Sequence, residues 1–287
     1  MHAEHSPISA KRIGLQALDG YPLTMFRYCA TGQPKGNILV GGATGVPQRF
    51  YARFAEFAIQ QGFNVHTLDY RGIGSSKPET LKGFEMEYLD WAKLDLAAAV
   101  DFLKNDPLPL FVVGHSFGGH AIGLLPNHQY IAKVYTFATG AGWHGWMPFG
   151  EQLKVRFLWN VAGPLLTRVM GYLPGKVMGI GEDLPLGVYR DWRRWCQYPR
   201  YFFDDPTMTH VHSQFAKVKV PIVAANALDD LWATPRSRDA FMAAYTGTEV
   251  KLLDIDPATS GAIGHMGYFK KGAEPLWNDV LAWFQKG

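Results

Sequence analysis

Apolar residues along the chain form two alternating patterns: short unbroken runs, and longer segments in which they recur every three or four positions. The short runs are typical of buried strands, and the periodic segments are typical of amphipathic helices. The runs predict strands over residues 12–18, 23–30, 37–40, 64–68, 110–113, 133–138, 218–225 and 249–253. The periodic segments predict helices over residues 49–61, 87–104, 235–245 and 274–285. This alternation predicts an α/β fold, with a mostly parallel central sheet and helices on both faces.

The helix predicted over residues 87–104 has one apolar side and one polar side. Its apolar side is formed by Trp91, Leu94, Ala98 and Phe102. Its polar side carries Asp90, Asp95 and Asp101. Because carboxylates on the outer side of a helix are hydrated, we expect solvent alone to account for these three aspartates.

The alternation stops between residues 141 and 204, where Trp, Gly and Pro become dense. The same α/β series resumes after residue 204, and no Ser- or Pro-rich linker borders the segment. Linkers of that kind usually mark a boundary between independent domains. We therefore expect a single α/β core made of residues 1–140 and 205–287, with residues 141–204 inserted into it.

Composition excludes one class of protein and gives no support to another. Hydrophobic residues make up 47% of the 287 residues and charged residues only 18%, which excludes a disordered chain. The formal net charge is +3, too small by itself to indicate a nucleic-acid partner.

Cysteine usage and apolar runs bear on the compartment. Two cysteines, Cys29 and Cys196, are too few for a disulfide framework and are typical of thiols in a reducing compartment. Residues 1–11 are polar and do not resemble a signal peptide. No apolar stretch approaches the ~18 residues of a membrane span. We therefore expect a soluble, cytoplasmic protein without a membrane partner.

The strongest chemical signal is Gly114-His115-Ser116-Phe117-Gly118, which matches G-x-S-x-G. An apolar run precedes it and a helix-capable stretch follows it, so Ser116 is predicted to lie on a sharp strand-to-helix turn. Glycines two residues to either side let neighbouring backbone pass without a clash with Cβ atoms. The pattern indicates a nucleophile elbow, in which the N-terminus of the next helix lies close to the serine hydroxyl.

A serine hydroxyl needs a base to accept its proton, and that base is usually a histidine oriented by a carboxylate. Of the ten histidines, His265 lies in a Gly-rich turn between the last predicted strand and the last predicted helix. Such a turn opens at the carboxyl edge of the sheet, where Ser116 is also expected. The carboxylate is expected after the strand over residues 218–225, where Asp229 and Asp230 both follow; the residue pattern leaves the choice between them open.

These segments together resemble the α/β-hydrolase fold family over nearly the whole chain outside the insertion. The resemblance rests on the order Ser116, Asp, His265, on the elbow, and on Asp69-Tyr70-Arg71-Gly72-Ile73-Gly74-Ser75, which is similar to the family's D-x-R-G-x-G-x-S segment. Residues 229–235 resemble the acid loop G-x-D-D-P-x-x-P, with Ala227 at the glycine position. Alignment with that loop implies Asp230 as the acid, with Asp229 as the alternative.

The resemblance also implies an oxyanion hole formed by two backbone amides. One is the amide after the nucleophile, here that of Phe117. The other comes from the loop Gly41-Gly42-Ala43-Thr44-Gly45, where Ala43 is the expected donor and Thr44 the alternative. The family's usual histidine is missing from this loop, but a backbone donor does not depend on that side chain.

The same family often inserts a cap over its active site at the position of residues 141–204. This segment holds eight basic and five acidic residues and five of the nine tryptophans. The tryptophans either pack the cap onto the core or line an apolar pocket above Ser116. We expect Trp143, Trp146 and Trp192 to contact substrate.

The function implied is a serine hydrolase of carboxylesterase type. It would cleave an ester or amide of a small, at least partly apolar molecule through an acyl-enzyme on Ser116. An acyltransferase with the same three residues, or a non-catalytic binding module of this fold, are the alternatives. No P-loop, G-x-G-x-x-G or metal-spaced Cys/His cluster is present in the sequence, so we expect no cofactor, no metal and no nucleic-acid partner.

Overall fold

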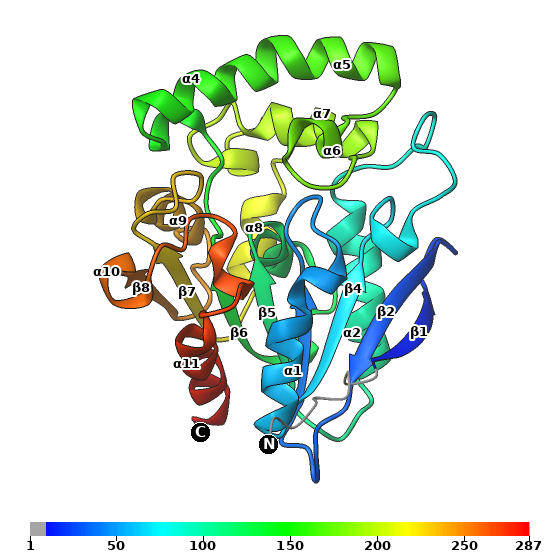
Figure 1. The fold of residues 1–287 in the computed structure, drawn as a ribbon, viewed down its shortest axis with the longest axis vertical. Coiled ribbons are helices and arrows are strands. Elements are labelled where there is room, and N and C mark those ends of the chain that lie inside the picture. The colour runs from blue at the N-terminus through cyan, green and yellow to red at the C-terminus, as the bar shows by residue number, and fades with distance from the viewer. Residues whose placement is uncertain (1–9, 287) are drawn as a thin grey trace, which may run out of the picture.

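A central sheet of eight strands organises residues 10–286, the part of the chain that the computed structural model describes (Figure 1). The strands are β1 (Lys11–Gln16), β2 (Pro22–Tyr28), β3 (Asn37–Gly41), β4 (Asn64–Asp69), β5 (Leu110–His115), β6 (Ile131–Phe137), β7 (Ile222–Ala227) and β8 (Val250–Ile255). Their order across the sheet is β1-β2-β4-β3-β5-β6-β7-β8. The strands from β4 to β8 pair in parallel, and β2 is antiparallel to both of its neighbours.

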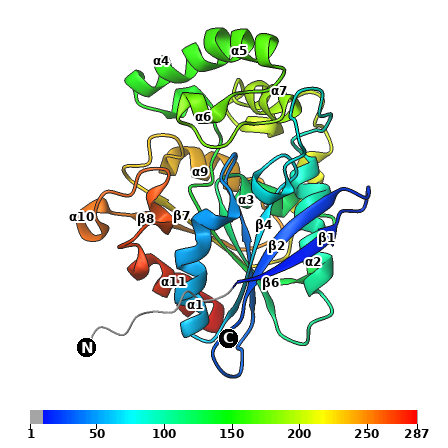
Figure 2. The ribbon, with the colours of Figure 1, turned by 45° about the vertical axis from the view of Figure 1, so that its right-hand side comes forward.

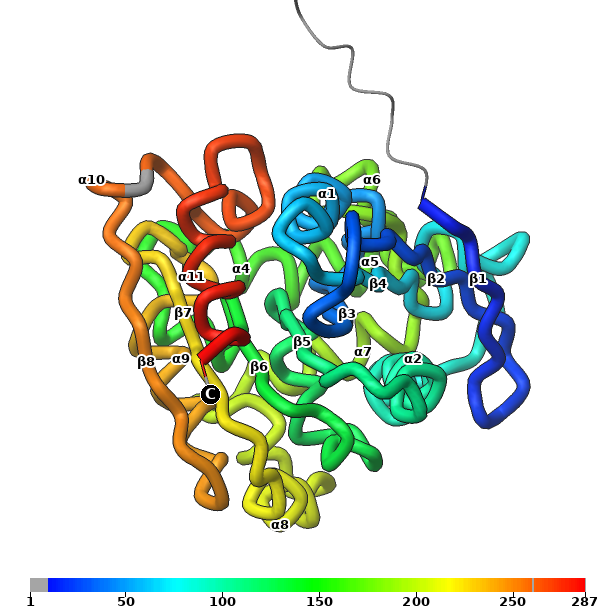
Figure 3. Tube along the Cα trace, turned by 90° about the horizontal axis from the view of Figure 1, so that it is seen from below, coloured from blue at the N-terminus to red at the C-terminus, as the bar shows by residue number. Residues whose placement is uncertain are grey.

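Helices cover both faces of this sheet, which confirms the predicted α/β class. They are α1 (Ala52–Gln60), α2 (Ala97–Leu103), α3 (Phe117–His120), α4 (Phe149–Phe157), α5 (Gly163–Met170), α6 (Gly175–Met178), α7 (Leu186–Trp195), α8 (Val211–Ala216), α9 (Pro235–Met242), α10 (Pro257–Ser260) and α11 (Glu274–Gln285). Figure 3 shows α1 and α11 on one side of the strands and α2 and α8 on the other.

Strand side chains alternate between the two covered faces, as strand geometry requires. In β5, Phe111 and Val113 pack with α1 and α11, whereas Leu110 and Val112 pack into the opposite core with α2. Both faces are therefore apolar. This explains why the central strands appear in the sequence as unbroken apolar runs rather than as alternating ones.

The expectation for residues 87–104 was wrong in its register. The chain forms a π-helical segment over Trp91–Leu96 before α2 begins, and a π-turn holds more residues than an α-turn. The side chains that follow are therefore displaced around the axis from the positions that an α-helical period assigns. Phe102 is 48% exposed, and Asp95 is completely buried.

Arg71, rather than solvent, accounts for Asp95. The backbone N–H and the Nε–H of Arg71 donate to the Asp95 carboxylate over 2.8 and 2.7 Å. The other guanidinium nitrogens donate to Asp19 over 2.6 and 3.1 Å. Burial raises the pKa of Asp95 to about 6, despite the opposing effect of Arg71. The arginine of the D-x-R-G segment is thus a tertiary clamp between the β1–β2 turn and the helix of residues 91–103.

Asp69, at the end of β4, is the first residue of the same segment and holds its loop in place. Its carboxylate accepts the backbone N–H of Gln48 over 2.7 Å and that of Ser75 over 2.8 Å. Gly74 has a φ of +50°, and a Cβ atom there would lie 2.4 Å from the Asp69 carboxylate. Glycine is therefore required where the loop folds back onto this acid.

Helices α4 to α7 lie above the carboxyl ends of the strands, as Figures 1 and 2 show from two directions. They belong to residues 141–204, which leave the sheet after β6 and return before β7. The strand order also reverses between β3 and β5, since α1 leads from β3 to β4 on one side and β5 pairs on the other. Ligands of open α/β sheets bind at such a point, outside the carboxyl ends of the strands.

His66 of β4 provides a test of the burial of the central strands. It is 1% exposed, and burial lowers its pKa to about 4. Between pH 6.5 and 4 the unfolded chain therefore binds a proton at this position that the folded chain does not, so stability falls as the pH falls. We expect wild type to lose about 2 kcal/mol more unfolding free energy than His66→Leu between pH 7 and pH 5. Urea titrations at both pH values measure the difference, and identical losses would contradict the assigned burial.

Candidate active site

Ser116 lies on a sharp turn between β5 and α3. Its φ of 52° and ψ of −109° are unusual for a residue with a side chain. The flanking glycines permit the close approaches around it. A Cβ at Gly118 would lie 2.0 Å from the carbonyl oxygen of Gly41, and one at Gly114 would lie 2.7 Å from the amide nitrogen of Gly119. The G-x-S-x-G spacing therefore reflects contact of α3 with β3 and β5.

His265 bridges Ser116 and Asp230. Its Nε2 lies 3.2 Å from Oγ of Ser116, and its Nδ1 lies 3.0 and 3.1 Å from the two carboxylate oxygens of Asp230. The three residues follow β5, β7 and β8, whose carboxyl ends lie at one edge of the sheet. The structure thus brings together the three side chains that the sequence separates by up to 149 positions.

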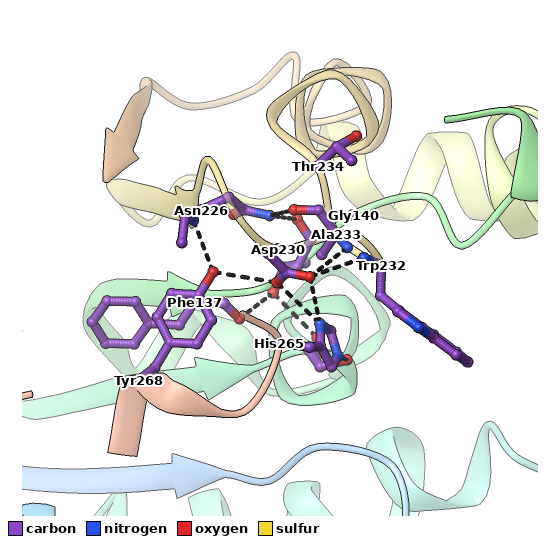
Figure 4. A network of polar contacts seen from close by, with 12 residues as sticks. Phe137, Gly140, Asn226, Asp230, Trp232, Ala233, Thr234, His265 and Tyr268 are labelled. Atoms are coloured by element: carbon purple, nitrogen blue, oxygen red, sulfur yellow. Dashed lines mark hydrogen bonds and ion pairs between the residues drawn. The ribbon is translucent and has the colours of Figure 1, made fainter. Parts of the chain in front are cut away.

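Asp230 is completely buried and has several hydrogen-bond donors around it (Figure 4). One oxygen accepts the backbone N–H groups of Trp232 and Ala233 over 3.0 and 2.9 Å. The other accepts the hydroxyl of Tyr268 over 3.2 Å. Burial by itself would raise the pKa of Asp230, but His265 and the two amides together hold that pKa below its ordinary value. The geometry and the charge favour an ionised Asp230 that accepts a hydrogen bond from Nδ1–H of His265.

Asp229 has a different partner. Its carboxylate accepts the backbone N–H of Ile263 over 2.8 Å, two residues before His265. Of the two adjacent acids, Asp230 therefore contacts the histidine, whereas Asp229 ties the loop after β7 to the loop that carries the histidine.

A second hydrogen-bond chain runs behind the site. The amide of Ala43 donates to the hydroxyl of Tyr51 over 2.8 Å, and this hydroxyl lies 3.0 Å from Nδ1 of His115. Nε2 of His115 lies 3.0 Å from the carbonyl oxygen of His265. A carbonyl only accepts, so Nε2 carries the proton and Nδ1 accepts from Tyr51. Burial, with a smaller contribution from His265, lowers the pKa of His115 to about 3 and keeps its ring neutral.

This chain corrects the expectation for Ala43. Its amide is already bonded to Tyr51 and is not free to meet an oxyanion. The amides of Thr44 and Phe117 donate to no other atom within residues 10–286. Thr44, the alternative from the sequence, thus has an amide that is free within residues 10–286, and its hydroxyl bonds to that of Tyr88.

A cavity of about 320 Å³ opens over Ser116 and His265. Its other lining residues are Ala43, Thr44, Val46, Gly179, Ile180, Gly181, Trp192, Trp232 and Met266. Most of these side chains are apolar. Of the three tryptophans expected to contact substrate, Trp192 lies on this cavity.

Trp143 and Trp146, which were also expected to contact substrate, are not among the residues that line this cavity. Their rings meet edge to face at 5.6 Å, and the indole N–H of Trp146 donates to the carbonyl of Pro199 over 2.7 Å. The Thr234 hydroxyl donates to the Trp146 carbonyl over 3.3 Å.

Sequence reasoning missed Tyr51, Tyr268 and Trp232. The hydroxyl of Tyr268 accepts the Ala227 amide over 2.8 Å and donates to Asp230, so it connects β7 to the acid. Its position three residues after His265 was the one available signal for Tyr268. Tyr51 gave no signal, because its partners lie 8 and 64 positions away. Within the described residues, no group of three His, Cys, Asp or Glu side chains has the arrangement of a metal site.

Comparison with known proteins shows the family to which the chain belongs. Residues 38–266 match the sequence profile of the alpha/beta hydrolase family. Monoglyceride lipase of Saccharomyces cerevisiae is 23% identical in an alignment that covers 89% of this chain and 86% of that protein.

Two solved structures show a similar fold. A soluble variant of the S. cerevisiae monoglyceride lipase, in complex with a substrate analog, has a TM-score of 0.65 at 17% identity and covers 98% of this chain and 97% of its own. DcsB in complex with its substrate analogue has a TM-score of 0.66 at 16% identity and covers 96% of this chain and 99% of its own.

The Tyr51 hydroxyl is expected to contribute to stability. Tyr51→Phe leaves the Ala43 amide and Nδ1 of His115 buried without a partner, which should lower the free energy of unfolding by about 1–3 kcal/mol. Tyr201→Phe is the matched control, because the Tyr201 hydroxyl is buried and has no partner among the described residues. That variant should be neutral or slightly stabilising. Equal effects of the two substitutions in urea unfolding would contradict the hydrogen-bond chain.

Proposed function

Since the chain belongs to the alpha/beta hydrolase family, we propose that it is a serine hydrolase of carboxylesterase type. Its substrate would be an ester of a small, partly apolar molecule, cleaved through an acyl-enzyme on Ser116. The observation that carries the proposal is the pair of hydrogen bonds that His265 makes, one with Oγ of Ser116 and one with the buried carboxylate of Asp230. Nucleophile, base and orienting acid are each within hydrogen-bond distance of the next.

The first half of the reaction acylates the serine. Nε2 of His265 takes the hydroxyl proton while Oγ of Ser116 bonds to the ester carbonyl carbon, and the carbonyl oxygen becomes an oxyanion. The amides of Phe117 and Thr44 donate to this oxyanion. The C–O bond to the alcohol then breaks, and Nε2–H of His265 gives its proton to the leaving oxygen.

The second half returns the enzyme to its starting state. His265 takes a proton from a water molecule, the hydroxide oxygen bonds to the acyl carbon, and the Ser116 ester bond breaks. The serine recovers its proton from His265, and the free acid leaves. Asp230 remains ionised throughout and stabilises the imidazolium that forms in each half.

The oxyanion site is expected to supply a large share of the acceleration. Backbone amides that already point at the developing charge need no reorganisation during the reaction, and each is worth roughly 3–4 kcal/mol in related sites. The choice of Thr44 and Phe117 rests on their free N–H groups and on the position of Thr44 on the cavity wall.

The cavity wall supports a small, partly apolar substrate. Trp192, Trp232, Ile180 and Met266 surround the approach to Ser116, and a volume of about 320 Å³ lies at the lower end of ligand sites. An ester is preferred to an amide because the curated relative is named a lipase.

We further propose that residues 141–204 act as a cap that sets specificity. They supply Trp192 and the stretch 179–181 to the cavity, while the core supplies Ser116, His265 and Trp232. The cap would thus form the part of the wall opposite the nucleophile.

Ser116→Ala should reduce turnover of p-nitrophenyl butyrate by about 10⁶-fold, because the base then has no nucleophile to activate. A fluorophosphonate probe should label Ser116 in wild type, as peptide mass spectrometry would show. Unchanged turnover in the variant, or absence of labelling, would exclude the proposed mechanism. Recovery of butyric acid, rather than a butyryl ester of an added alcohol, separates hydrolysis from acyl transfer.

The adjacent acids provide a matched pair of variants. Asp230→Asn should lower kcat by about 10⁴-fold, because an amide does not hold His265 in the required tautomer. Asp229→Asn keeps an oxygen for the Ile263 amide and should retain wild-type kcat within a few-fold. If Asp229→Asn is the more damaging substitution, the assignment of Asp230 is wrong.

Chain length tests the size of the cavity. Turnover of p-nitrophenyl esters should be highest for short acyl chains and fall as the chain lengthens. Trp192→Ala should move the optimum to longer acyl chains, because loss of the indole ring enlarges the cavity over Ser116. Trp143→Ala is the control, since that ring is not part of the wall. The same shift in both variants would contradict the assignment of Trp192.

A further inference from the structure

The outer surface of the inserted segment carries a continuous row of exposed apolar side chains. Helix α4, the π-helical segment Leu158–Ala162 and α5 form one long helical rod over residues 149–170. Figures 1 and 2 show this rod as the uppermost element, on the side away from the sheet. The row recurs every fourth residue and is 51–75% exposed: Phe149, Leu153, Phe157, Val161, Leu165 and Val169. We call these six residues the outer row.

The π-helical segment keeps the outer row on one side of the rod. In an α-helix, a spacing of four residues slightly exceeds one turn of 3.6, so such a row drifts steadily around the axis. A π-turn contains more residues, so the same spacing falls short of a full turn there and the drift is reversed. The opposite side of the rod is buried at Val155, Trp159 and Thr167. The rod therefore has two apolar sides, of which one packs onto the rest of the protein.

An exposed apolar row of this length is unusual for a surface that meets only water. Single exposed apolar residues need no explanation, but a contiguous set marks a surface that contacts another phase or protein. The inner side of the rod already packs on α7, where Trp159 meets Trp192 at 5.0 Å. The outer row is thus not needed to attach the rod to the protein.

Charge distinguishes between the possible partners. Within the rod, residues 149–170, the basic residues are Lys154, Arg156 and Arg168, all exposed. Glu151, the acidic residue of the rod, pairs with Lys154 at 2.6 Å, so the surplus positive charge of the rod is that of Arg156 and Arg168. A second copy of the chain on this surface would bring like charges together, whereas an anionic lipid surface complements them. Basic residues beside exposed Phe and Leu are also typical of helices that lie in the membrane interface.

We propose that the outer row docks the protein on an anionic lipid surface. The rod lies along the surface, with the outer row among the acyl chains and the basic side chains at the headgroups. No helix in the described part of the chain is long and apolar enough to cross a membrane, so the contact is peripheral. This docking concerns binding alone and does not depend on the chemistry at Ser116.

If the proposed hydrolase function also holds, docking has a consequence for substrate supply. The side of the rod facing the core holds Trp159, and Trp192 connects that ring to the cavity wall. A docked rod therefore places the roof of the cavity next to the phase in which apolar esters accumulate.

The experiment is vesicle co-sedimentation of the full chain. Wild type should bind vesicles of 70% phosphatidylcholine and 30% phosphatidylglycerol, and bind pure phosphatidylcholine several-fold more weakly. Phe157→Ser with Leu165→Ser should weaken binding to the anionic vesicles by about tenfold or more, because two anchoring side chains are lost. Leu18→Ser with Leu228→Ser is the matched control, since both leucines are exposed on the core.

Charge is tested by a second pair of variants. Arg156→Gln with Arg168→Gln should weaken binding by about tenfold at low salt, since each cation near the surface adds to binding. Arg53→Gln with Lys251→Gln, which removes two exposed cations of the core, should not. All four variants should retain wild-type turnover of a water-soluble ester, which shows that they fold.

Three results would overturn the proposal. One is the absence of binding to the anionic vesicles. Another is binding that Phe157→Ser with Leu165→Ser leaves unchanged. The third is a combination of two findings: wild type does not bind vesicles, and it self-associates in sedimentation velocity in a way that Phe157→Ser with Leu165→Ser abolishes. That result would assign the outer row to a second copy of the chain.

Discussion

The buried charge of Asp230 is the constraint around which the candidate site is arranged. An ionised carboxylate taken out of water is costly unless donors surround it. Here the donors come from two loops: the amides of Trp232 and Ala233 from the loop after β7, and the Tyr268 hydroxyl and His265 from the loop after β8. The partners that keep the acid charged therefore also fix the distance between these loops. His265 reaches Ser116 because its other nitrogen is held in this way.

The features that the sequence predicted are those determined by local geometry. The elbow at Ser116 was visible because the glycines that a sharp turn requires lie within two residues of it. The strands were visible because both faces of the sheet are covered, which makes each strand an apolar run. The order of Ser116, an aspartate and His265 followed from the alternation of strands and loops along one edge, whereas the choice of Asp230 over Asp229 came from the resemblance to the family's acid loop.

The features that the sequence did not predict depend on distant partners. Asp95 appeared to be a solvated acid, because neither its contact with Arg71 nor the π-turn beneath it leaves a periodic trace. Ala43 appeared to be a free donor, because Tyr51 occupies its amide through a fold-back that no spacing reports. Trp143 and Trp146 could not be told from Trp192 by composition, since all three are aromatic residues of one inserted segment.

The hydrogen-bond chain through Tyr51 and His115 joins two loops that do different work. One end holds the amide of Ala43, next to Thr44, and the other end holds the carbonyl of His265. A local unfolding event that releases the histidine loop would also release a partner on which the loop after β3 relies, so we expect the two loops to open as one cooperative unit. Their amide protons would then exchange with solvent at similar rates. Disorder that separates His265 from Ser116 would at the same time loosen the loop that carries the proposed Thr44 donor, so a half-assembled site would be a rare state.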